Sequence, residues 1–166
     1  MVPGATGYVR TMSDSPREPE HVAGYLGALS AFSAGVVTLA VVGKATGRSL
    51  PQRFDPVDLA IGGIATYKFA RLVSKDAVTT PVRIPFTKFK ENAGSAEVNE
   101  EPRKGEPTHT IGELLTCPFC LAPWISAGYV AGLALSPRMA RTWAAVFSIV
   151  GASDLLQHAY AHVRAD

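Results

Sequence analysis

The chain has 166 residues, a formal net charge of +2 at pH 7, 47% hydrophobic residues and 18% charged residues. So small a net charge does not indicate nucleic-acid binding, and two cysteines are too few for a disulfide-stabilised secreted scaffold. The charged residues are concentrated between long apolar runs, which is the distribution of a membrane protein rather than of a soluble domain.

The first 20 residues differ from the rest of the chain. Residues 1–20 hold three prolines and scattered charges, and they contain no apolar run of the kind that forms a signal peptide. We therefore expect a disordered N-terminal tail and no cleavable leader.

Residues 21–73 are predicted to form a first pair of transmembrane helices. No side chain from Val22 to Val42 is charged, and this length matches the roughly 20 residues that a helix needs to cross a bilayer. Gly27, Ala31 and Gly35 recur at every fourth position of this run, a spacing that lets another helix pack closely.

The second helix of the pair is predicted over Val57–Val73. Asp55 can cap its N-terminus, and Pro56 fits its first turn. Lys68 and Arg71 lie near the other end, where we expect their long side chains to reach the lipid headgroups. Because of these charges, a soluble amphipathic helix is the alternative interpretation.

Residues 74–110 form a long polar connection that we expect on the cytoplasmic side. Its first half mixes basic residues with apolar ones, and Pro81 and Pro85 forbid one long helix, so we expect a segment that lies in the membrane interface. Its second half is acidic and is expected to be a mobile loop. The acidic residues are Glu97, Glu100 and Glu101.

Residues 111–163 contain both cysteines and a predicted second pair of transmembrane helices. Thr110 and Glu113 have the spacing of a capping box, which would start a short helix near Ile111. Cys117 and Cys120 then stand at the start of a long apolar run. Placed near a helix N-terminus, Cys117 would face the positive end of the helix dipole, which favours the thiolate that redox exchange and metal binding both require.

The apolar run Phe119–Leu135 is uncharged and predicts the third span, and Met139–Val163 predicts the fourth. Gly128 and Gly132 form a GxxxG pattern within the third span, which favours close helix packing. The predicted fold is therefore all-α: a polytopic membrane protein with about four transmembrane helices and an interfacial segment before the third.

Basic residues indicate how the helices are oriented. Nine lysines and arginines fall in the tails and the 74–110 connection, against five on the opposite side. Because basic loops stay in the cytoplasm, both termini and the connection are predicted to face the cytoplasm of a plasma-membrane protein. The cysteines would then lie in a reducing compartment, where a stable disulfide is not expected.

The last helix offers a possible polar site. Asp154, His158 and His162 recur at every fourth residue, so they share one helix face. Asp154 lies deep enough to need a partner, for which Lys68, Arg71 or a hydroxyl group are candidates. Two cysteines and two histidines are also a ligand set that zinc favours, but interfacial histidines and packed cysteines are the simpler interpretation.

Three motifs in order resemble the small bacterial membrane proteins of the DUF1360 family, whose function is unknown. The motifs are Ala70–Thr87, Gly112–Trp124 and Ala152–Gln157. The resemblance implies a helical inner-membrane protein and no particular activity. It implies a polar signature of Arg71, Lys75, Asp76, Arg83, Glu113 and Asp154 together with the two cysteines.

These observations favour a structural or interaction protein that binds lipid, itself or another membrane protein, with no cofactor and no nucleic acid. The alternative is membrane thiol–disulfide exchange, with Cys117 as nucleophile and Cys120 resolving, or zinc binding by this pair. The signature charges are expected to gather at one cytoplasmic mouth and to pair there.

Overall fold

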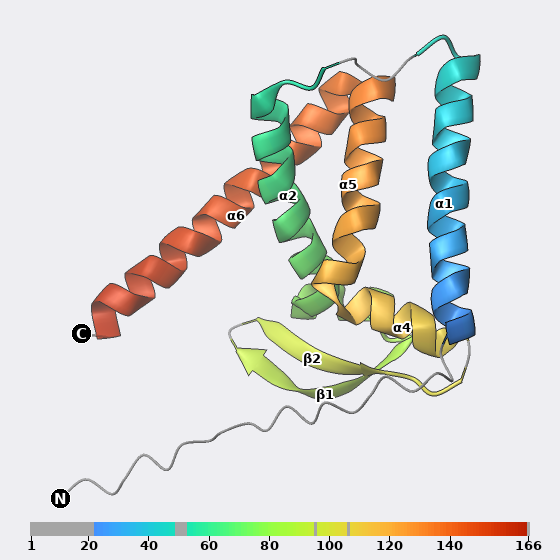
Figure 1. Ribbon diagram of the computed structural model, residues 1–166. Helices are drawn as coiled ribbons and strands as arrows, with labels where there is room; N and C mark the ends of the chain where they lie inside the picture. The colour runs from blue at the N-terminus through green and yellow to red at the C-terminus, as the bar shows by residue number, and fades with distance from the viewer. Residues whose placement is uncertain (1–21, 49–52, 95, 106, 166) are drawn as a thin grey trace, which may run out of the picture.

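The computed structural model describes residues 22–48, 53–94, 96–105 and 107–165, so the predicted tail lies outside the described part of the chain. The described residues are mainly helical, with one β-hairpin (Figure 1). In chain order the elements are α1 (Val22–Ala45), α2 (Pro56–Lys75), a 3₁₀ turn (Ala77–Thr79), α3 (Thr80–Arg83), β1 (Thr87–Gly94), β2 (Glu97–Pro102), α4 (Thr108–Thr116), α5 (Pro118–Leu135) and α6 (Pro137–Ala165).

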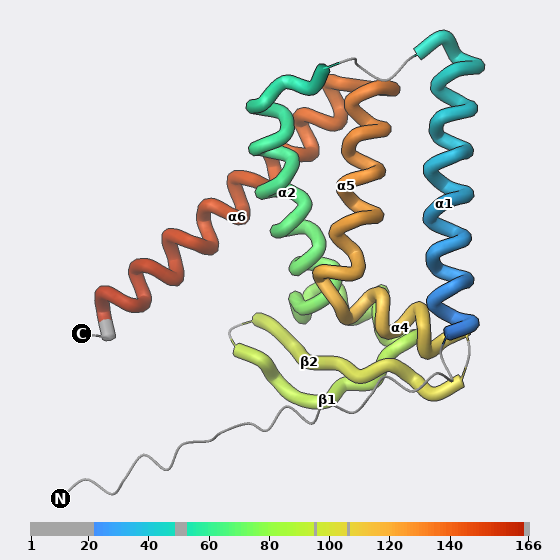
Figure 2. Tube along the Cα trace, viewed as in Figure 1, coloured from blue at the N-terminus to red at the C-terminus, as the bar shows by residue number. Residues whose placement is uncertain are grey.

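The long helices α1, α2 and α5 run roughly side by side, and α6 crosses them obliquely (Figures 1 and 2). The hairpin and α4 cover one end of this bundle, where α1 begins, α2 ends and α5 begins. The α5–α6 turn lies at the opposite end. We call the segment from the 3₁₀ turn to the end of α4, residues 77–116, the cap.

The core lies where α2, α5 and α6 meet. Tyr129 and Leu133 of α5 pack with Ala65 of α2 and with two alanines of α6 in one buried cluster. Phe69 of α2 adds an edge-on contact with Phe147 of α6, with ring centroids 4.7 Å apart. The alanines of this cluster let the helices approach closely enough for the aromatic rings to pack against one another.

Helix α1 stands apart from this core. Its described contacts with the bundle include an edge-on ring contact of Phe32 with Trp124 at 5.1 Å and a hydrogen bond from Arg48 to the Leu135 carbonyl at 2.8 Å. A Cβ added at Gly27 or Gly35 would meet no atom within 4 Å. The small-residue stripe predicted to pack against another helix is therefore open in this chain.

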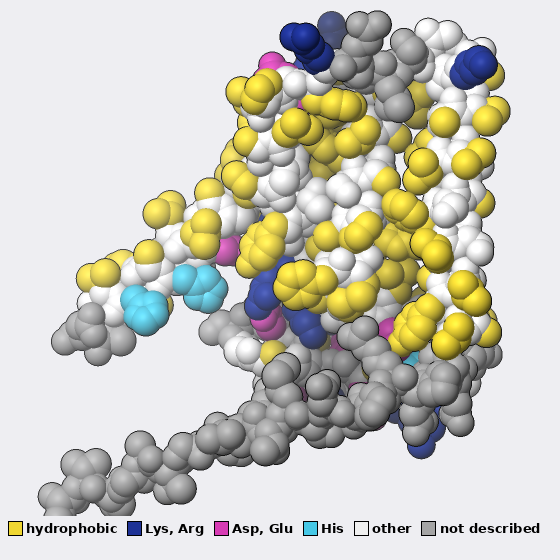
Figure 3. Space-filling model, viewed as in Figure 1, with side chains coloured by type: hydrophobic (Ala, Val, Ile, Leu, Met, Phe, Trp, Pro, Cys, Tyr) yellow, Lys and Arg dark blue, Asp and Glu magenta, His cyan; other side chains and the backbone are white. Residues whose placement is uncertain are grey.

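Two of the described helices are long and apolar enough to cross a membrane, judged by length and composition. They are Val22–Ala45 and Pro118–Leu135. Large hydrophobic side chains cover much of the visible face of the bundle (Figure 3). The helices α2 and α6 carry more charge, so the predicted total of four spans goes beyond what these criteria support.

The polar connection is folded, which corrects part of the sequence interpretation. The expected interfacial segment and mobile loop form two short helical turns and an antiparallel hairpin, in which Thr87 pairs with Pro102 and Phe89 pairs with Glu100. Mostly exposed, polar side chains cover β1, so the strand lacks the alternation that would have predicted it.

Helix starts agree with the sequence at two places and differ at one. Asp55 caps α2 by accepting a 2.8 Å hydrogen bond from the Val57 N–H, and Cys117 is the N-cap of α5. The predicted capping box does not form, because α4 begins at Thr108 and Thr110 therefore lies inside the helix. Glu113 instead accepts a 2.7 Å hydrogen bond from the Tyr25 hydroxyl of α1.

Candidate functional site

Two neighbouring features at the cap end of the bundle carry the chemistry of this chain: a network of ion pairs and the cysteine pair. The network is centred on Arg83, whose side chain is fully buried. Its guanidinium donates to both carboxylate oxygens of Glu100, each at 2.9 Å, and to the Val73 carbonyl at 2.7 Å. This bidentate pair ties α3 to β2 and to the end of α2.

Hydroxyl groups complete the surroundings of Glu100. Thr87 donates to its carboxylate at 2.6 Å and Thr80 at 3.1 Å. Burial alone would raise the pKa of Glu100, but the hydrogen bonds from Arg83, Thr87 and Thr80 outweigh it and hold the pKa below its usual value. Glu100 is therefore ionised, and the charge of Arg83 is matched inside the cap.

A second bidentate pair lies beside the first. The Arg71 guanidinium donates two 2.8 Å hydrogen bonds to the Glu97 carboxylate, which links α2 to the start of β2. The Arg71 side chain is 41% exposed, so this pair is partly hydrated and contributes less to stability than the buried one. Glu97 and Glu100 are two of the three acidic residues that were expected in a mobile loop.

Of the candidate partners of Asp154, which were Lys68, Arg71 and a hydroxyl group, the structure pairs it with Lys68. The Lys68 ammonium lies 2.8 Å from the Asp154 carboxylate and 3.4 Å from that of Asp76. Lys68 is buried, so the expectation that it reaches the headgroups was wrong. Gly151 packs against the Lys68 side chain, which brings α6 close enough to α2 for Asp154 to reach the ammonium.

The predicted signature residues are thus brought together only in part. The two signature arginines pair with residues outside the signature: Arg71 with Glu97 and Arg83 with Glu100, both in β2. The signature aspartates Asp76 and Asp154 both contact Lys68, which also lies outside the signature. Lys75 is half-buried and forms no ion pair with the described residues. Glu97 and Glu100 were not predicted as ion-pair partners, because their positions depend on the hairpin and the sequence did not predict a hairpin.

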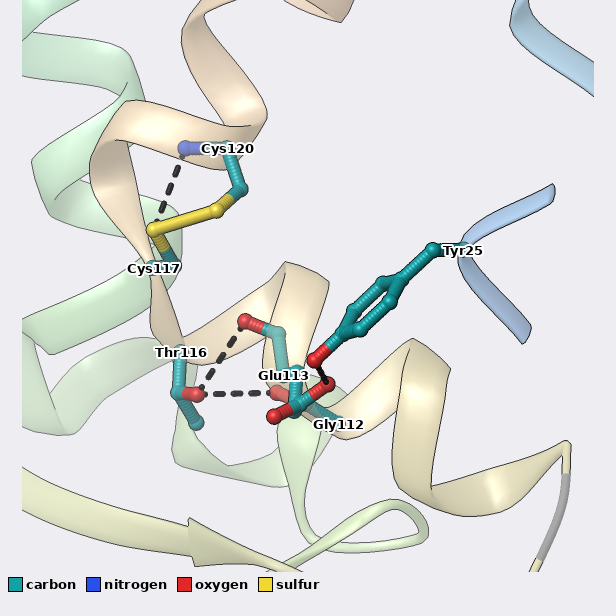
Figure 4. The surroundings of a disulfide bond; sticks show 6 residues. All are labelled: Tyr25, Gly112, Glu113, Thr116, Cys117 and Cys120. Atoms are coloured by element: carbon teal, nitrogen blue, oxygen red, sulfur yellow. Dashed lines mark hydrogen bonds between the residues drawn. A yellow bond between two sulfur atoms is a disulfide. The ribbon is translucent and has the colours of Figure 1, made fainter. Parts of the chain in front are cut away.

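The cysteine pair lies where α4 ends and α5 begins (Figure 4). The sulfurs of Cys117 and Cys120 lie at the distance of a disulfide pair, and the Cys117 sulfur accepts a hydrogen bond from the Cys120 N–H at 3.2 Å. The two residues are therefore placed to form a disulfide, and the expectation that the compartment keeps them reduced stays a prediction. Pro118 lies in the first turn of α5, where its missing N–H costs no helical hydrogen bond, so the sequence itself places Cys117 at the helix N-terminus.

The histidines do not join the cysteines. His158 lines a cleft of about 380 Å³ with Lys68, Asp76 and Asp154, and His162 lies one turn further along the exposed end of α6. Within the described part of the chain, no group of three or more histidine, cysteine, aspartate or glutamate side chains could hold a metal ion. Zinc favours four such ligands, so the alternative set of two cysteines and two histidines is not assembled among the described residues.

The part of the chain that carries these features is similar to known proteins. The sequence model described as "Protein of unknown function (DUF1360)" matches residues 61–160, which run from α2 through the cap and the cysteines into α6 and leave out α1. The chain is also 29% identical over 97 residues to the UPF0713 protein YngL of Bacillus subtilis (strain 168), an alignment that covers 58% of this chain and 72% of that protein. No solved structure matches the chain.

Proposed function

This chain belongs to the DUF1360 family of proteins of unknown function, and we propose that it is a polytopic membrane protein whose Cys117–Cys120 pair exchanges a disulfide with partner thiols. The observation that carries the chemical part is the pairing of the two cysteines at the N-terminus of α5. The membrane part rests on the helices that surround them.

Four helices are proposed to cross the bilayer, with the cap at one membrane face. Large hydrophobic side chains on α1 are exposed, including Leu26, Leu29, Val37 and Val41. An apolar surface of this extent is costly in water and favourable in lipid. The charges of α2 and α6 are compatible with burial because they are paired, as in Lys68–Asp154 and in Arg141–Asp58 near the other end.

The exchange uses the two sulfurs in sequence. A partner thiolate attacks the Cys117 sulfur, the disulfide breaks, and Cys120 leaves as a thiolate that takes up a proton. The second thiol of the partner, after losing its proton, attacks the mixed disulfide and releases the Cys117 thiolate, which takes up the second proton. The partner has then lost two electrons and two protons, and the cysteine pair has gained them.

The N-terminus of α5 favours this reaction. The released Cys117 thiolate accepts the Cys120 N–H and faces the positive end of the helix dipole, and a stabilised thiolate is a better leaving group. Cys117 is half-buried and Cys120 is exposed, so neither residue is sealed in the core.

A cysteine-trapping experiment tests the exchange. Disulfide exchange also runs in reverse, with the reduced Cys117 thiolate attacking a partner disulfide. In Cys120→Ser the resulting mixed disulfide has no second thiol within the chain to resolve it, so we expect partner proteins to be retained on non-reducing gels and released by a reductant. Cys117→Ser is the matched control and should trap much less. Equal trapping by both variants, or none by either, would contradict the proposed order of attack.

The interaction role predicted from the sequence is the second candidate, favoured by the open face of α1 at Gly27 and Gly35. Helices with small residues at this spacing associate in membranes. This role predicts that a Cys117→Ala, Cys120→Ala double variant keeps its fold and its binding partners. The exchange proposal predicts that the same variant folds but loses redox turnover.

A further inference from the structure

A groove separates α1 from α4 and α5 at the cap end of the bundle. Its volume is about 560 Å³, and its lining is almost wholly apolar. Helix α1 contributes small residues such as Gly27 and Ala31, α4 contributes Leu114, and α5 contributes Trp124. Figure 3 shows hydrophobic side chains along both α1 and α5 on the visible face of the bundle.

The cysteine pair lies next to this groove. Trp124 follows Cys120 by four residues on α5, so the two side chains share a helix face one turn apart. That face is turned to α1, because the Trp124 ring contacts the Phe32 ring. In Figure 4 the Cys120 side chain points from the first turn of α5 toward Cys117, and Tyr25 of α1 lies further away, against Glu113 of α4.

The size and chemistry of the groove limit what can occupy it. Its volume lies within the range of about 300–1,000 Å³ that is typical of small-molecule sites, whereas a transmembrane helix of roughly 10 Å diameter needs far more room. Its apolar lining suits a hydrocarbon chain. The cysteine pair beside it, which is placed to form a disulfide, also needs an oxidant that converts the dithiol to the disulfide.

We propose that the groove binds the hydrocarbon tail of a membrane quinone, whose ring then oxidises the reduced Cys117–Cys120 pair. The two thiols give up two electrons and two protons, the sulfur–sulfur bond forms, and both quinone oxygens become hydroxyl groups of the hydroquinone. Cys120 faces the quinone and Cys117 faces the protein partner. This inference rests on the proposed disulfide exchange and names the oxidant for it.

The test is reoxidation of the purified, reduced, full-length protein in lipid nanodiscs. We expect a benzoquinone with a decyl tail to restore the disulfide with one hydroquinone formed per pair, followed by absorbance and by thiol titration. Benzoquinone without a tail should need a much higher concentration to reach the same rate. Equal concentration dependence for the two quinones would overturn the assignment of the groove, and this comparison uses the unaltered protein.

A matched pair of variants locates the site. Gly27→Leu fills the groove, whereas Gly35→Leu adds the same side chain two turns along α1, outside the groove lining. Because neither added Cβ meets another atom, both variants should fold, which thermal unfolding checks. We expect Gly27→Leu to slow reoxidation by the tailed quinone about tenfold, on the scale of one overpacked side chain, and Gly35→Leu to leave it unchanged.

The outcomes separate the two proposals. If the wild-type pair exchanges with a dithiol peptide but the tailed quinone does not reoxidise it, the quinone inference fails and the exchange function stands. If the pair does not exchange with the dithiol peptide, the exchange function itself fails. If native mass spectrometry shows a phospholipid that Gly27→Leu displaces while the quinone rate stays the same, the groove is an acyl-chain site and the inference is wrong.

Discussion

Arg83 is the residue on which the fold of the cap depends most. Replacing it with leucine would leave the buried Glu100 carboxylate without its cation and would remove the bond to the Val73 carbonyl. Breaking one side of a buried ion pair costs about 3–5 kcal/mol. We therefore expect Arg83→Leu to lower the free energy of unfolding by about that amount, measured by thermal unfolding and by faster hydrogen exchange of the hairpin amides.

The Arg71–Glu97 pair is the matched control, because it has the same bidentate geometry at a hydrated position. Exposed pairs contribute roughly 0.2–1 kcal/mol, so Arg71→Leu should lower stability only slightly. Equal losses for the two variants would show that the burial of Arg83 does not govern the stability of the cap.

The pH dependence of the cap follows from Glu100. The pKa of its carboxyl is lower in the folded chain than in the unfolded chain, where it is about 4.3, because the hydrogen bonds from Arg83, Thr87 and Thr80 outweigh burial. The resulting stabilisation is complete above the unfolded pKa and is lost as the pH falls through the folded pKa. Stability of the hairpin should therefore be constant near neutral pH and decline below about pH 4.

The measurement is the unfolding midpoint as a function of pH in wild type and two variants. Glu100→Gln should remove most of the decline, because glutamine does not titrate. Glu101→Gln, at the exposed neighbouring position of β2, should keep it. A decline that persists in Glu100→Gln would assign the pH dependence to another carboxyl group.

The need for an ion-pair partner could be predicted from the sequence where an unpaired charge would lie in an apolar helix. Asp154 in an apolar helix needed a cation, and the structure supplies Lys68. The partners of Arg71 and Arg83 could not be predicted in this way. They come from β2, a mostly polar strand with three glutamates, and nothing in its sequence signals which carboxylates turn inward.

At the scale of elements, the contact between α2 and α5 depends on one glycine. A Cβ at Gly62 would clash with the nearest atoms of the Tyr129 ring. Tyr129 is buried, and its hydroxyl donates to the Asp58 carbonyl at 3.0 Å. The ring therefore has little freedom to move. We expect Gly62→Ala to destabilise the bundle by about 1–3 kcal/mol, the usual cost of overpacking, measured by thermal unfolding in detergent.

Gly63 provides the adjacent control. A Cβ there meets no atom within 4 Å, and alanine is the better helix former by roughly 0.5–1 kcal/mol. Gly63→Ala should therefore leave stability unchanged or raise it. If both alanine variants behave alike, the α2–α5 contact does not have the close packing described above.

Helices could be predicted from the sequence more completely than the cap. Apolar runs and strong start signals, such as Asp55-Pro56 and Cys117-Pro118, gave α2 and α5 nearly at their observed starts. The hairpin was missed because β2 lacks the alternation of apolar and polar residues that predicts a strand. Val98 is the buried apolar residue of β2. Its stability depends instead on ion pairs with α2 and α3, which local pattern does not encode.

For the whole molecule, the course of α6 explains why the alternative zinc site does not form. Such a site would require α6 to bring His158 and His162 next to the cysteines. Instead it crosses α2 at Gly151 and then leaves the bundle, so its last turns are exposed (Figure 2). His158 instead lines a cleft with Lys68 and Asp154, and neither cysteine is among the residues that line this cleft.

The orientation of the bundle in the membrane decides which compartment the cysteine pair meets. The charge count of nine against five predicts that the cap faces the cytoplasm, whereas a lasting disulfide is more common outside it. Single reporter cysteines in a Cys117→Ser, Cys120→Ser background test this directly. Asn92→Cys lies in the hairpin and Ser136→Cys in the α5–α6 turn, and both positions are exposed.

We expect a membrane-impermeant maleimide to label Ser136→Cys in intact cells and to label Asn92→Cys only after permeabilisation. That result places the cap in the cytoplasm, where the pair would be kept reduced unless a quinone reoxidises it. The reverse labelling would overturn the charge-based orientation and place the pair where disulfides persist. Labelling of both positions from the same side would contradict the proposed crossing of α5, because these two reporters lie at opposite ends of that helix.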